Sequence, residues 1–381
     1  MLDMPLSFYF IIAIFVIHFV SRHIARQISP TPSTSNIPVM INRRGGRVIP
    51  GLRGGPGGLL GRPRVPIPPQ DDKSVEGEQS SSSTTTDSEE FDPDLDDVLA
   101  VKDLLKRAGS LPDEIALMIL DSAEYWACSS TTIDYTNLPQ KHLVIRGGRP
   151  NENQFLVRSE PLGMTSWAPD QQEAWRLQAI PQPLQHELPR EILEQYVDKR
   201  LDAVLGSPCR KIVFKIQSTD QGWGGNHEDR GTYRGSWTWF DAGLERFEST
   251  TESTSDSKHS LSIPVNALRP IWPTITEDSP GSTTYDHGLH AQPDHKIQCN
   301  KTATRGTQDH VVEWRYTDDI DPEFSAADEL EAAGRGRATG NGEFVRNLKL
   351  GDVVTVWGRA RFGAWHNQIK RVELKVYWKA V

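Results

Sequence analysis

The residues best suited to recognition chemistry are tryptophans and arginines that gather in two stretches. Residues 220–241 read DQGWGGNHEDRGTYRGSWTWFD, and residues 353–365 read VVTVWGRARFGAW. Indole and guanidinium groups stack on sugar rings and other planar groups, and they are common anchors of protein interfaces. The alternative is that these tryptophans fill the core between two sheets. The two stretches predict a ligand-binding surface of eight residues: Trp223, Tyr233, Trp237, Trp239, Trp357, Arg359, Arg361 and Trp365.

Catalytic chemistry has little support in the sequence. It contains no HExxH, GxSxG, P-loop or dinucleotide-binding fingerprint. Asp220, Glu228 and Asp229 could pair as acid and base, but acidic residues beside glycines more often serve turns. We therefore expect no enzymatic activity and no catalytic residues.

Metal and disulfide chemistry have equally weak signals. His287, His290 and His295 are spaced irregularly and lack acidic or cysteine partners at fixed spacing. The three cysteines are far apart and odd in number, which argues against a disulfide framework or a zinc site. We expect no metal and no cofactor.

Alternating apolar and polar residues predict the strands that would position these side chains. In residues 211–218 the apolar face is Ile212, Phe214 and Ile216. In residues 353–362 one face holds Val354, Val356, Ala360 and Phe362, and the other holds Val353, Thr355, Trp357, Arg359 and Arg361.

Further strands are expected at residues 142–146, 155–158, 310–316 and 372–378. Together the strands predict a mainly β protein with an antiparallel β-sandwich over residues 137–381. The apolar spacing of residues 189–205 predicts one helix within this domain.

A short helical module is expected ahead of the sandwich, over residues 95–136. Within it, residues 111–120 read LPDEIALMIL, which resembles the opening of an F-box, the module that docks onto a ubiquitin-ligase adaptor. The further leucine-rich helices of an F-box are not evident after Trp126. A short amphipathic helix pair packing on the next domain is the alternative interpretation.

The N-terminus carries an apolar run that predicts a membrane anchor. Residues 5–20 read PLSFYFIIAIFVIHFV, close to the minimum of about 17 residues for a spanning helix. We assign residues 1–26 to the anchor and residues 5–21 to the span. The arginines that follow predict that the C-terminal body faces the cytosol. The alternatives are a cleaved signal peptide, a core helix or a gene-model artefact.

Residues 27–94 have the composition of a disordered linker, rich in glycine, proline and serine. Residues 43–64 resemble an RGG-type basic stretch that could touch RNA or anionic lipid headgroups, although a solvated tether is the simpler interpretation. The formal net charge of the chain is −9, so we expect no specific nucleic-acid partner.

Four blocks carry a family resemblance: KIVFKIQSTDQGWGG, GTYRGSWTWFD, DHVVEWRYTDDIDP and LKLGDVVTVWGRARFGAWHNQIKRVELKVYW. They resemble a family of uncharacterised fungal proteins in which an F-box-like helix, ending in an element like residues 123–126, precedes a Trp-rich β domain. The resemblance covers residues 111–381 and implies little about function. More loosely, the aromatic strands are similar to galactose-binding-like sandwiches of F-box-associated type, which implies a jelly roll.

These observations predict a membrane-anchored, non-enzymatic interaction or adaptor protein that binds a protein or a glycan through its Trp/Arg surface. One alternative is an F-box-like, substrate-recruiting subunit of a ubiquitin ligase. Another is a secreted lectin-like domain, which would require a cleaved leader and use of the glycosylation sequon at Asn300.

Overall fold

The protein is described by a computed structural model covering residues 91–201, 206–249 and 263–380. The predicted anchor at residues 1–26 and all but the last residues of the predicted linker lie outside these ranges. The described residues belong to one compact unit that begins at Phe91. Within it, every helix is too short or too polar to cross a membrane.

Sheet A is the first of two five-stranded antiparallel sheets, with strand order β1-β12-β4-β10. The long strand β12 pairs with β4 along one side, and with β2 and then β1 along the other. Its strands are β1 (Ala127–Asp134), β2 (Leu143–Arg146), β4 (Cys209–Thr219), β10 (Gln308–Arg315) and β12 (His366–Trp378).

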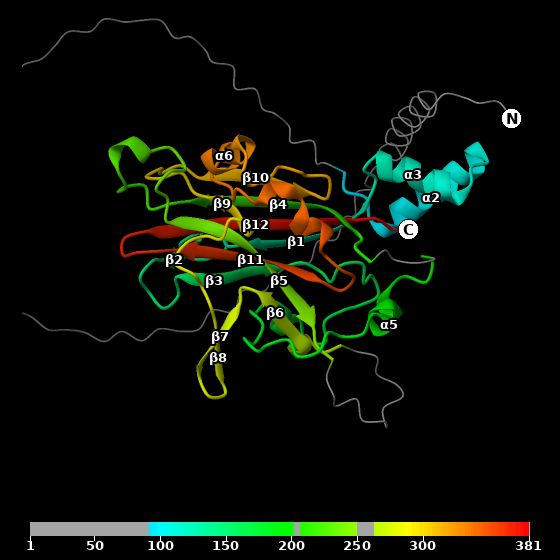
Figure 1. Ribbon diagram of the computed structural model, residues 1–381, viewed down its shortest axis with the longest axis horizontal. Coiled ribbons are helices and arrows are strands. Elements are labelled where there is room, and N and C mark those ends of the chain that lie inside the picture. The colour runs from blue at the N-terminus through cyan, green and yellow to red at the C-terminus, as the bar shows by residue number, and fades with distance from the viewer. Residues whose placement is uncertain (1–90, 202–205, 250–262, 381) are drawn as a thin grey trace, which may run out of the picture. The chain divides into compact units, whose positions relative to one another are not determined.

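Sheet B has strand order β3-β11-β5-β6, with β9 pairing with the start of β5 beside β6. It packs against sheet A, as Figure 1 shows. Its strands are β3 (Asn153–Arg158), β5 (Thr238–Phe247), β6 (Leu268–Trp272), β9 (Lys296–Cys299) and β11 (Val353–Ala360). The strands β7 (Ile275–Ser279) and β8 (Ser282–Tyr285) form a separate hairpin. The described chain is therefore mainly β and antiparallel, as predicted.

The core lies between the two sheets and uses the apolar faces that the alternation predicts. From sheet A, Ile212, Phe214 and Ile216 are buried side by side with every second residue of β12. From sheet B, Val354 and Val356 are fully buried. The interface is so close that a Cβ on Gly358 would lie 2.6 Å from Ile145 Cδ1. The period-two pattern therefore correctly predicts which faces meet.

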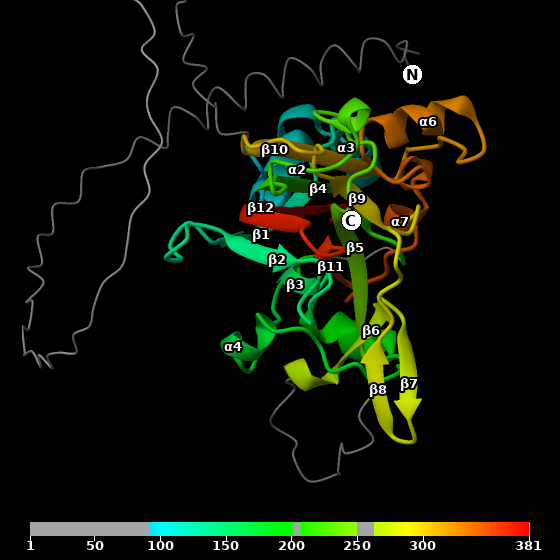
Figure 2. The same ribbon diagram turned by 90° about the vertical axis from the view of Figure 1, so that its left-hand side faces the viewer.

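Sheet B is buried on its outer face as well. One cover is the chain after β3, which includes the single-turn helix α4 (Gln172–Trp175) and folds back over Arg158. The other is the segment 286–295 between β8 and β9, here called the strap. In Figure 2 the yellow chain after β8 runs along sheet B toward β9.

The helical module is a pair of helices, α2 (Leu95–Gly109) and α3 (Asp113–Ser122). Asp94 and Asp97 cap α2 reciprocally, each accepting from the backbone N–H of the other. Asp113 forms ion pairs with Lys102 and Lys106 of α2. The predicted module of residues 95–136 is therefore helical only up to residue 122, because residues 127–134 are strand β1 of sheet A.

The remaining helices are short. The helix predicted over residues 189–205 is only one turn, α5 (Arg190–Leu193), continued by a 3-10 turn at Glu194–Tyr196; residues 202–205 are not described. The segment starts after Pro189, and the chain turns extended at Val197. The others are α6 (Ser325–Ala332), α7 (Glu343–Arg346) and three 3-10 turns at His227–Asp229, Val265–Ala267 and Thr339–Asn341.

Candidate functional site

The eight predicted binding residues divide into two groups that lie in different environments. Trp239, Trp357, Arg359 and Arg361, on or directly after the strands of sheet B, are all buried. The other four lie in loops and are exposed or half-buried: Trp223, Tyr233, Trp237 and Trp365. The eight therefore do not form one exposed Trp/Arg surface. Whether any of them binds a ligand stays a prediction.

The buried group belongs to an ion-pair network on the outer face of sheet B. Arg359 Nε donates to Asp241 Oδ2 at 3.0 Å, and Arg359 Nη1 donates to Asn153 Oδ1 at 3.1 Å. The guanidinium also lies 5.1 Å from the ring centre of Trp357. Burial lowers the pKa of Arg359, and the neighbouring Asp241 carboxylate opposes that effect. The arginine is held in place by side chains of the protein itself.

His287 of the strap closes over this network. Its Nδ1 lies 2.6 Å from Arg359 Nη1, and because a guanidinium can only donate, Nδ1 must be the acceptor. Burial, followed by the charges of Arg359 and Arg361, lowers the pKa of His287 to about 3. The imidazole is therefore neutral near pH 7, and it fixes the strap to the sheet.

A second buried ion pair lies on the same face of sheet B. Arg158 Nε and Nη2 contact the two carboxylate oxygens of Glu245 at 2.6 and 3.0 Å. Both side chains are 1% exposed, and the guanidinium lies 4.8 Å from the ring centre of Trp175. Asp241 and Glu245 lie four residues apart on β5 and so face the same side of the sheet. Neither was among the predicted functional residues. Their charge on a strand with buried neighbours is the signal that marks them.

A pocket of about 240 Å³ opens between the strap and sheet B. Its floor is formed by Asp241, Arg359 and Arg361, and its wall by Trp272 and the three strap histidines. His295 stacks on Trp272 at 4.0 Å between ring centres and its Nδ1 lies 3.0 Å from the backbone oxygen of Ala242. The three histidines thus do share a site, although no described group of three or more His, Cys, Asp or Glu residues has the arrangement of a metal centre.

The loop group gathers at one end of the sandwich. Trp237 packs edge-on against Phe362 at 4.5 Å between ring centres and lies 5.4 Å from the ring of His290. Trp223 is 55% exposed and Phe362 is 46% exposed. Gln221 ties two of the loops together, because its side chain donates to the Trp223 carbonyl and accepts from the His366 N–H. We call Trp223, Trp237, Leu289, Phe362 and Trp365 the aromatic end.

Phe362 was predicted on the apolar face of its strand, and that prediction is wrong. β11 ends at Ala360, so the alternation stops before Phe362. Phe362 instead has a left-handed backbone with φ of 62° and points its ring to the surface. The turn residues Gly363 and Ala364 that follow are the signal that could have indicated this end of the strand.

Two of the three acidic residues considered for catalysis, Asp220 and Asp229, hold the loops together. Asp220 is buried and accepts hydrogen bonds from the backbone N–H groups of Gly222, Ala303 and Thr304. Burial raises the pKa of Asp220, and these three bonds oppose the rise. Asp229 accepts from Asn226 and pairs with Arg234 in the same loop. Asp220 therefore links the loop after β4 to the loop after β9 through hydrogen bonds.

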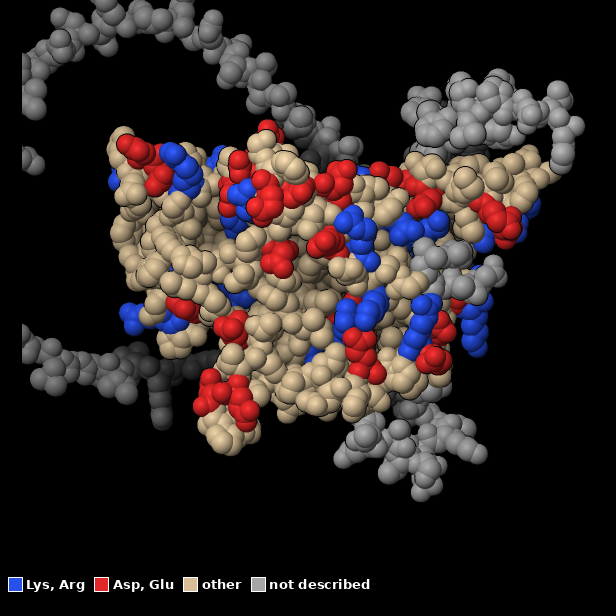
Figure 3. All heavy atoms as spheres, in the orientation of Figure 1, with Lys and Arg blue, Asp and Glu red and all other residues tan. Residues whose placement is uncertain are grey.

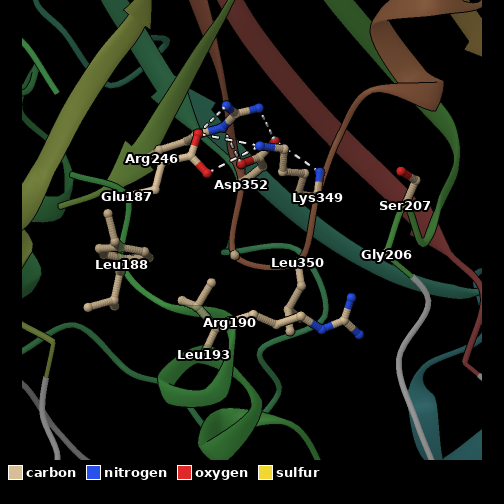
Figure 4. A pocket seen from close by; sticks show the side chains of 12 residues that line it. Glu187, Leu188, Arg190, Leu193, Gly206, Ser207, Arg246, Lys349, Leu350 and Asp352 are labelled. Atoms are coloured by element: carbon tan, nitrogen blue, oxygen red, sulfur yellow. Dashed lines mark hydrogen bonds and ion pairs between the residues drawn. The ribbon is translucent and has the colours of Figure 1, made fainter. Parts of the chain in front are cut away.

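A larger pocket of about 380 Å³ lies at the C-terminal end of β5 (Figure 4). Arg246 is held between Asp352 at 2.8 Å and Glu187 at 2.8 Å, and Lys349 also pairs with Glu187. Figure 4 shows these four charged side chains paired with one another along the upper wall of the pocket. This arrangement fits a structural clamp between the chain before α5 and β5.

The F-box-like segment presents apolar side chains to solvent. On α3, Met118 is 63% exposed and Ile115 is 36% exposed, whereas Ala116 and Leu120 are buried. The end of α3 is fixed to the sandwich through Asp121, which accepts from Trp126 Nε1 and pairs with Arg210 and Lys379. The helix pair is thus docked on the sandwich by one face and open on another.

The sequon at Asn300 is not available in the folded chain. Asn300 is fully buried, and its amide contacts Ser218, Thr238 and Asn367 at 2.7 to 3.0 Å. A glycan cannot be attached to this side chain without unfolding the end of the sandwich. The secreted alternative, which also requires a cleaved leader, stays a prediction.

Comparison of the chain with family models, with curated proteins and with solved structures finds no match.

Proposed function

We propose that this protein is an interaction module that binds a protein partner through the aromatic end of its β-sandwich. The observation that carries the proposal is the joint exposure of large apolar side chains there: Trp223, Phe362 and Leu289 are each about half exposed, at 55%, 46% and 52%. Exposed apolar residues that cluster mark interaction sites, and aromatic residues dominate the binding energy of protein interfaces.

A protein partner fits this surface better than a glycan. Sugar sites combine an aromatic face with several convergent polar groups that bind hydroxyls. At the aromatic end the neighbours of Trp237 are the rings of Phe362 and His290, and the Gln221 side chain is already bound within the loops. The surface is therefore mainly apolar.

The proposal also includes four features that the sequence predicts. These are a galactose-binding-like jelly-roll arrangement of the sandwich, a disordered linker, a membrane anchor over residues 5–21 and a body that faces the cytosol. Topology is tested with a C-terminal tag, by carbonate extraction followed by protease treatment of intact vesicles. A tag that stays with the membrane and is digested supports the arrangement. A protected, secreted or soluble tag contradicts it.

The interaction proposal is tested with a matched pair of exposed phenylalanines. Phe362→Asn removes an aromatic-end side chain at a left-handed position that asparagine tolerates, and Phe324→Asn removes one that is 67% exposed elsewhere. Loss of a central anchor costs about 2 kcal/mol or more, over tenfold in affinity. Proteins captured by the full tagged wild-type chain should be lost with Phe362→Asn and retained with Phe324→Asn. Equal loss, or no loss, contradicts the proposal. A wild-type signal on a glycan array that Phe362→Asn abolishes would assign the surface to sugars.

A second candidate function, an F-box-like subunit of a ubiquitin ligase, is favoured by the exposed apolar side of α3. Docking of a ligase adaptor there would bury Ile115 and Met118. Ile115→Asp should abolish co-purification of the adaptor, and Ile180→Asp, on another exposed isoleucine, should leave it unchanged. Absence of the adaptor from the wild-type complex rules this candidate out.

A further inference from the structure

Arginines without a counter-charge flank the aromatic end. The side chains of four are exposed, and none has an ion pair or a hydrogen bond with another described residue: Arg146, Arg149, Arg230 and Arg305. The buried arginines of sheet B, by contrast, each pair with a carboxylate of the same sheet. The four exposed guanidinium groups can therefore pair with a ligand without breaking a contact of the described fold.

Two of these arginines lie on the Phe362 side of the aromatic end. Arg146 stands opposite His366 in the pairing of β2 with β12. Burial, followed by the charge of Arg146, lowers the pKa of His366. Arg149 belongs to the turn after β2, which touches the turn after β11: a Cβ on Gly147 would lie 2.4 Å from the Phe362 carbonyl oxygen. Two positive charges therefore border the turn that carries Phe362.

The other two lie on the Trp223 side. Arg305 packs on the glycine that precedes Trp223, since a Cβ on Gly222 would lie 2.5 Å from Arg305 Cγ. Arg230 belongs to the same loop as Trp223, after β4. The N–H of Gly231 donates to a carbonyl of the Arg305 loop at 2.8 Å, which holds the two loops together. The aromatic end thus has two unpaired arginines on each side.

The acidic side chains of the same loops are nearly all occupied. Asp220 accepts from three backbone N–H groups, and Asp229 and Glu152 are each paired with another arginine. Glu228 is the one acidic side chain of these loops that is exposed and has no side-chain partner among the described residues. The strap adds two acidic residues, which line its pocket on the outer face of sheet B: Asp286 and Asp294. The unpaired charge beside the aromatic end is therefore mainly positive.

Apolar anchors between unpaired guanidinium groups are complementary to an acidic partner. Arginine pairs with carboxylates in a bidentate geometry, and opposite charges at the rim of an interface steer association and select partners. A nucleic acid fits less well, because its binding domains are basic and this chain has a formal net charge of −9. We propose that the protein partner of the aromatic end presents an acidic segment, in which Asp or Glu side chains flank an apolar anchor. The inference rests on the proposed function and names the chemistry of that partner.

The test is selection from a phage-displayed library of random dodecapeptides, with the full chain as bait. Two double variants are compared with the wild type. The first, Arg149→Gln with Arg305→Gln, removes one guanidinium from each side of the aromatic end. The second, Arg107→Gln with Arg176→Gln, is the control and removes two exposed guanidinium groups outside these loops. Phe362→Asn reports on the aromatic end itself. A short oligothymidine is the nucleic-acid probe.

Peptides that the wild type selects should combine Asp or Glu with an aromatic or aliphatic residue, and Phe362→Asn should not enrich them. Their affinity, measured by fluorescence anisotropy, should fall about fivefold or more in the first double variant and by less than about twofold in the control. Binding should also weaken as salt rises above about 0.1 M, where charges more than about 10 Å apart are screened.

The two proposals fail in different ways. Selected peptides that are apolar without an acidic bias, or that bind both double variants equally, would overturn the inference and leave the proposed function standing. No enrichment that depends on Phe362 would contradict both. Tighter binding of the oligothymidine than of every selected peptide would assign the surface to nucleic acid and overturn the inference.

Discussion

At the scale of single residues, the arginines of this chain illustrate how a side chain that looks suited to binding can serve the fold. Arg158 and Arg359 are each almost fully buried, and each is held by a carboxylate and an aromatic ring of the same sheet, Phe155 for Arg158 and Trp357 for Arg359. Removing one partner from such a pair leaves an uncompensated charge in a dry environment. These side chains therefore fix the covers of sheet B and the register of its strands.

The Arg158–Glu245 pair gives the clearest test of this role. Glu245→Gln should lower the free energy of unfolding by about 3–5 kcal/mol, because the buried guanidinium loses its counter-charge. The matched control, Glu194→Gln, breaks an exposed pair with Arg190 and should cost about 1 kcal/mol or less. Urea denaturation followed by tryptophan fluorescence measures both. Similar losses in the two variants would contradict a structural role for the buried pair.

His287 predicts a dependence of stability on pH. Its pKa of about 3 in the folded chain lies below the value of about 6.5 expected when unfolded. Its contribution is therefore fully present above pH 6.5 and is lost as the pH falls toward 3, because only the unfolded chain takes up the proton. His287→Asn keeps an acceptor for Arg359 and removes the titration. The unfolding free energy of this variant should fall less between pH 7 and pH 5 than that of the wild type. An unchanged slope would show that His287 does not stay neutral.

At the scale of elements, sheet B depends on a close approach between β5 and its neighbours. A Cβ on Gly243 would lie 2.3 Å from Thr355 Oγ1, 2.7 Å from the Trp272 carbonyl oxygen and 3.0 Å from Trp357 Nε1. All three contacts are with the backbone or a side chain of a neighbouring strand of the sheet. The absence of a side chain at residue 243 therefore allows the Trp357 ring to approach the backbone of β5. Tyr285 packs edge-on against this ring at 5.2 Å between ring centres.

Gly243→Ala should therefore destabilise the protein by about 1–3 kcal/mol through overpacking. Gly306→Ala is the control, since nothing lies within 4 Å of its Cβ position. Thermal unfolding monitored by circular dichroism separates the two: the midpoint of Gly243→Ala should fall by several degrees and that of Gly306→Ala should stay near the wild-type value. No difference between them would mean that sheet B can open at Gly243 without cost.

The strands were predictable because their alternation is local, but the covers of sheet B were not. Ile212, Phe214 and Ile216 reveal their common face within eight residues of sequence. The burial of Trp357 and Arg359 depends instead on the strap, some seventy residues away, whose sequence has the polar composition of a surface loop. The pairing of Arg359 with Asp241 likewise requires the β5–β11 register, which a single sequence does not contain.

At the scale of the whole described unit, the two candidate surfaces lie at opposite ends of the sandwich (Figure 1). The helix pair and the start of the described chain lie at one end, where Asp92 contacts Lys375 and Tyr377 of β12. The aromatic end lies where β12 begins. β12 has 13 residues, so at about 3.3 Å per residue the two ends are about 40 Å apart.

The side of the described unit that Figure 3 shows is charged, in contrast to the apolar aromatic end. Charged side chains of both signs are mixed over the face that Figure 3 shows, and acidic groups gather on the projecting β7–β8 hairpin, which carries Glu277 and Asp278. Mixed charge favours solubility over association. Compared with the side that Figure 3 shows, the aromatic end is the better candidate for the proposed protein contact. Asp92, at the start of the described chain, lies at the far end from it.

The most direct measurement of this account is site-specific photo-crosslinking in cells with the full chain. Benzoylphenylalanine would replace Trp223 in one sample, Phe362 in a second and Phe324, as the control, in a third. The account predicts the same protein adduct from positions 223 and 362 and none from position 324. No adduct from the two aromatic-end positions, or an identical adduct from all three, would contradict it.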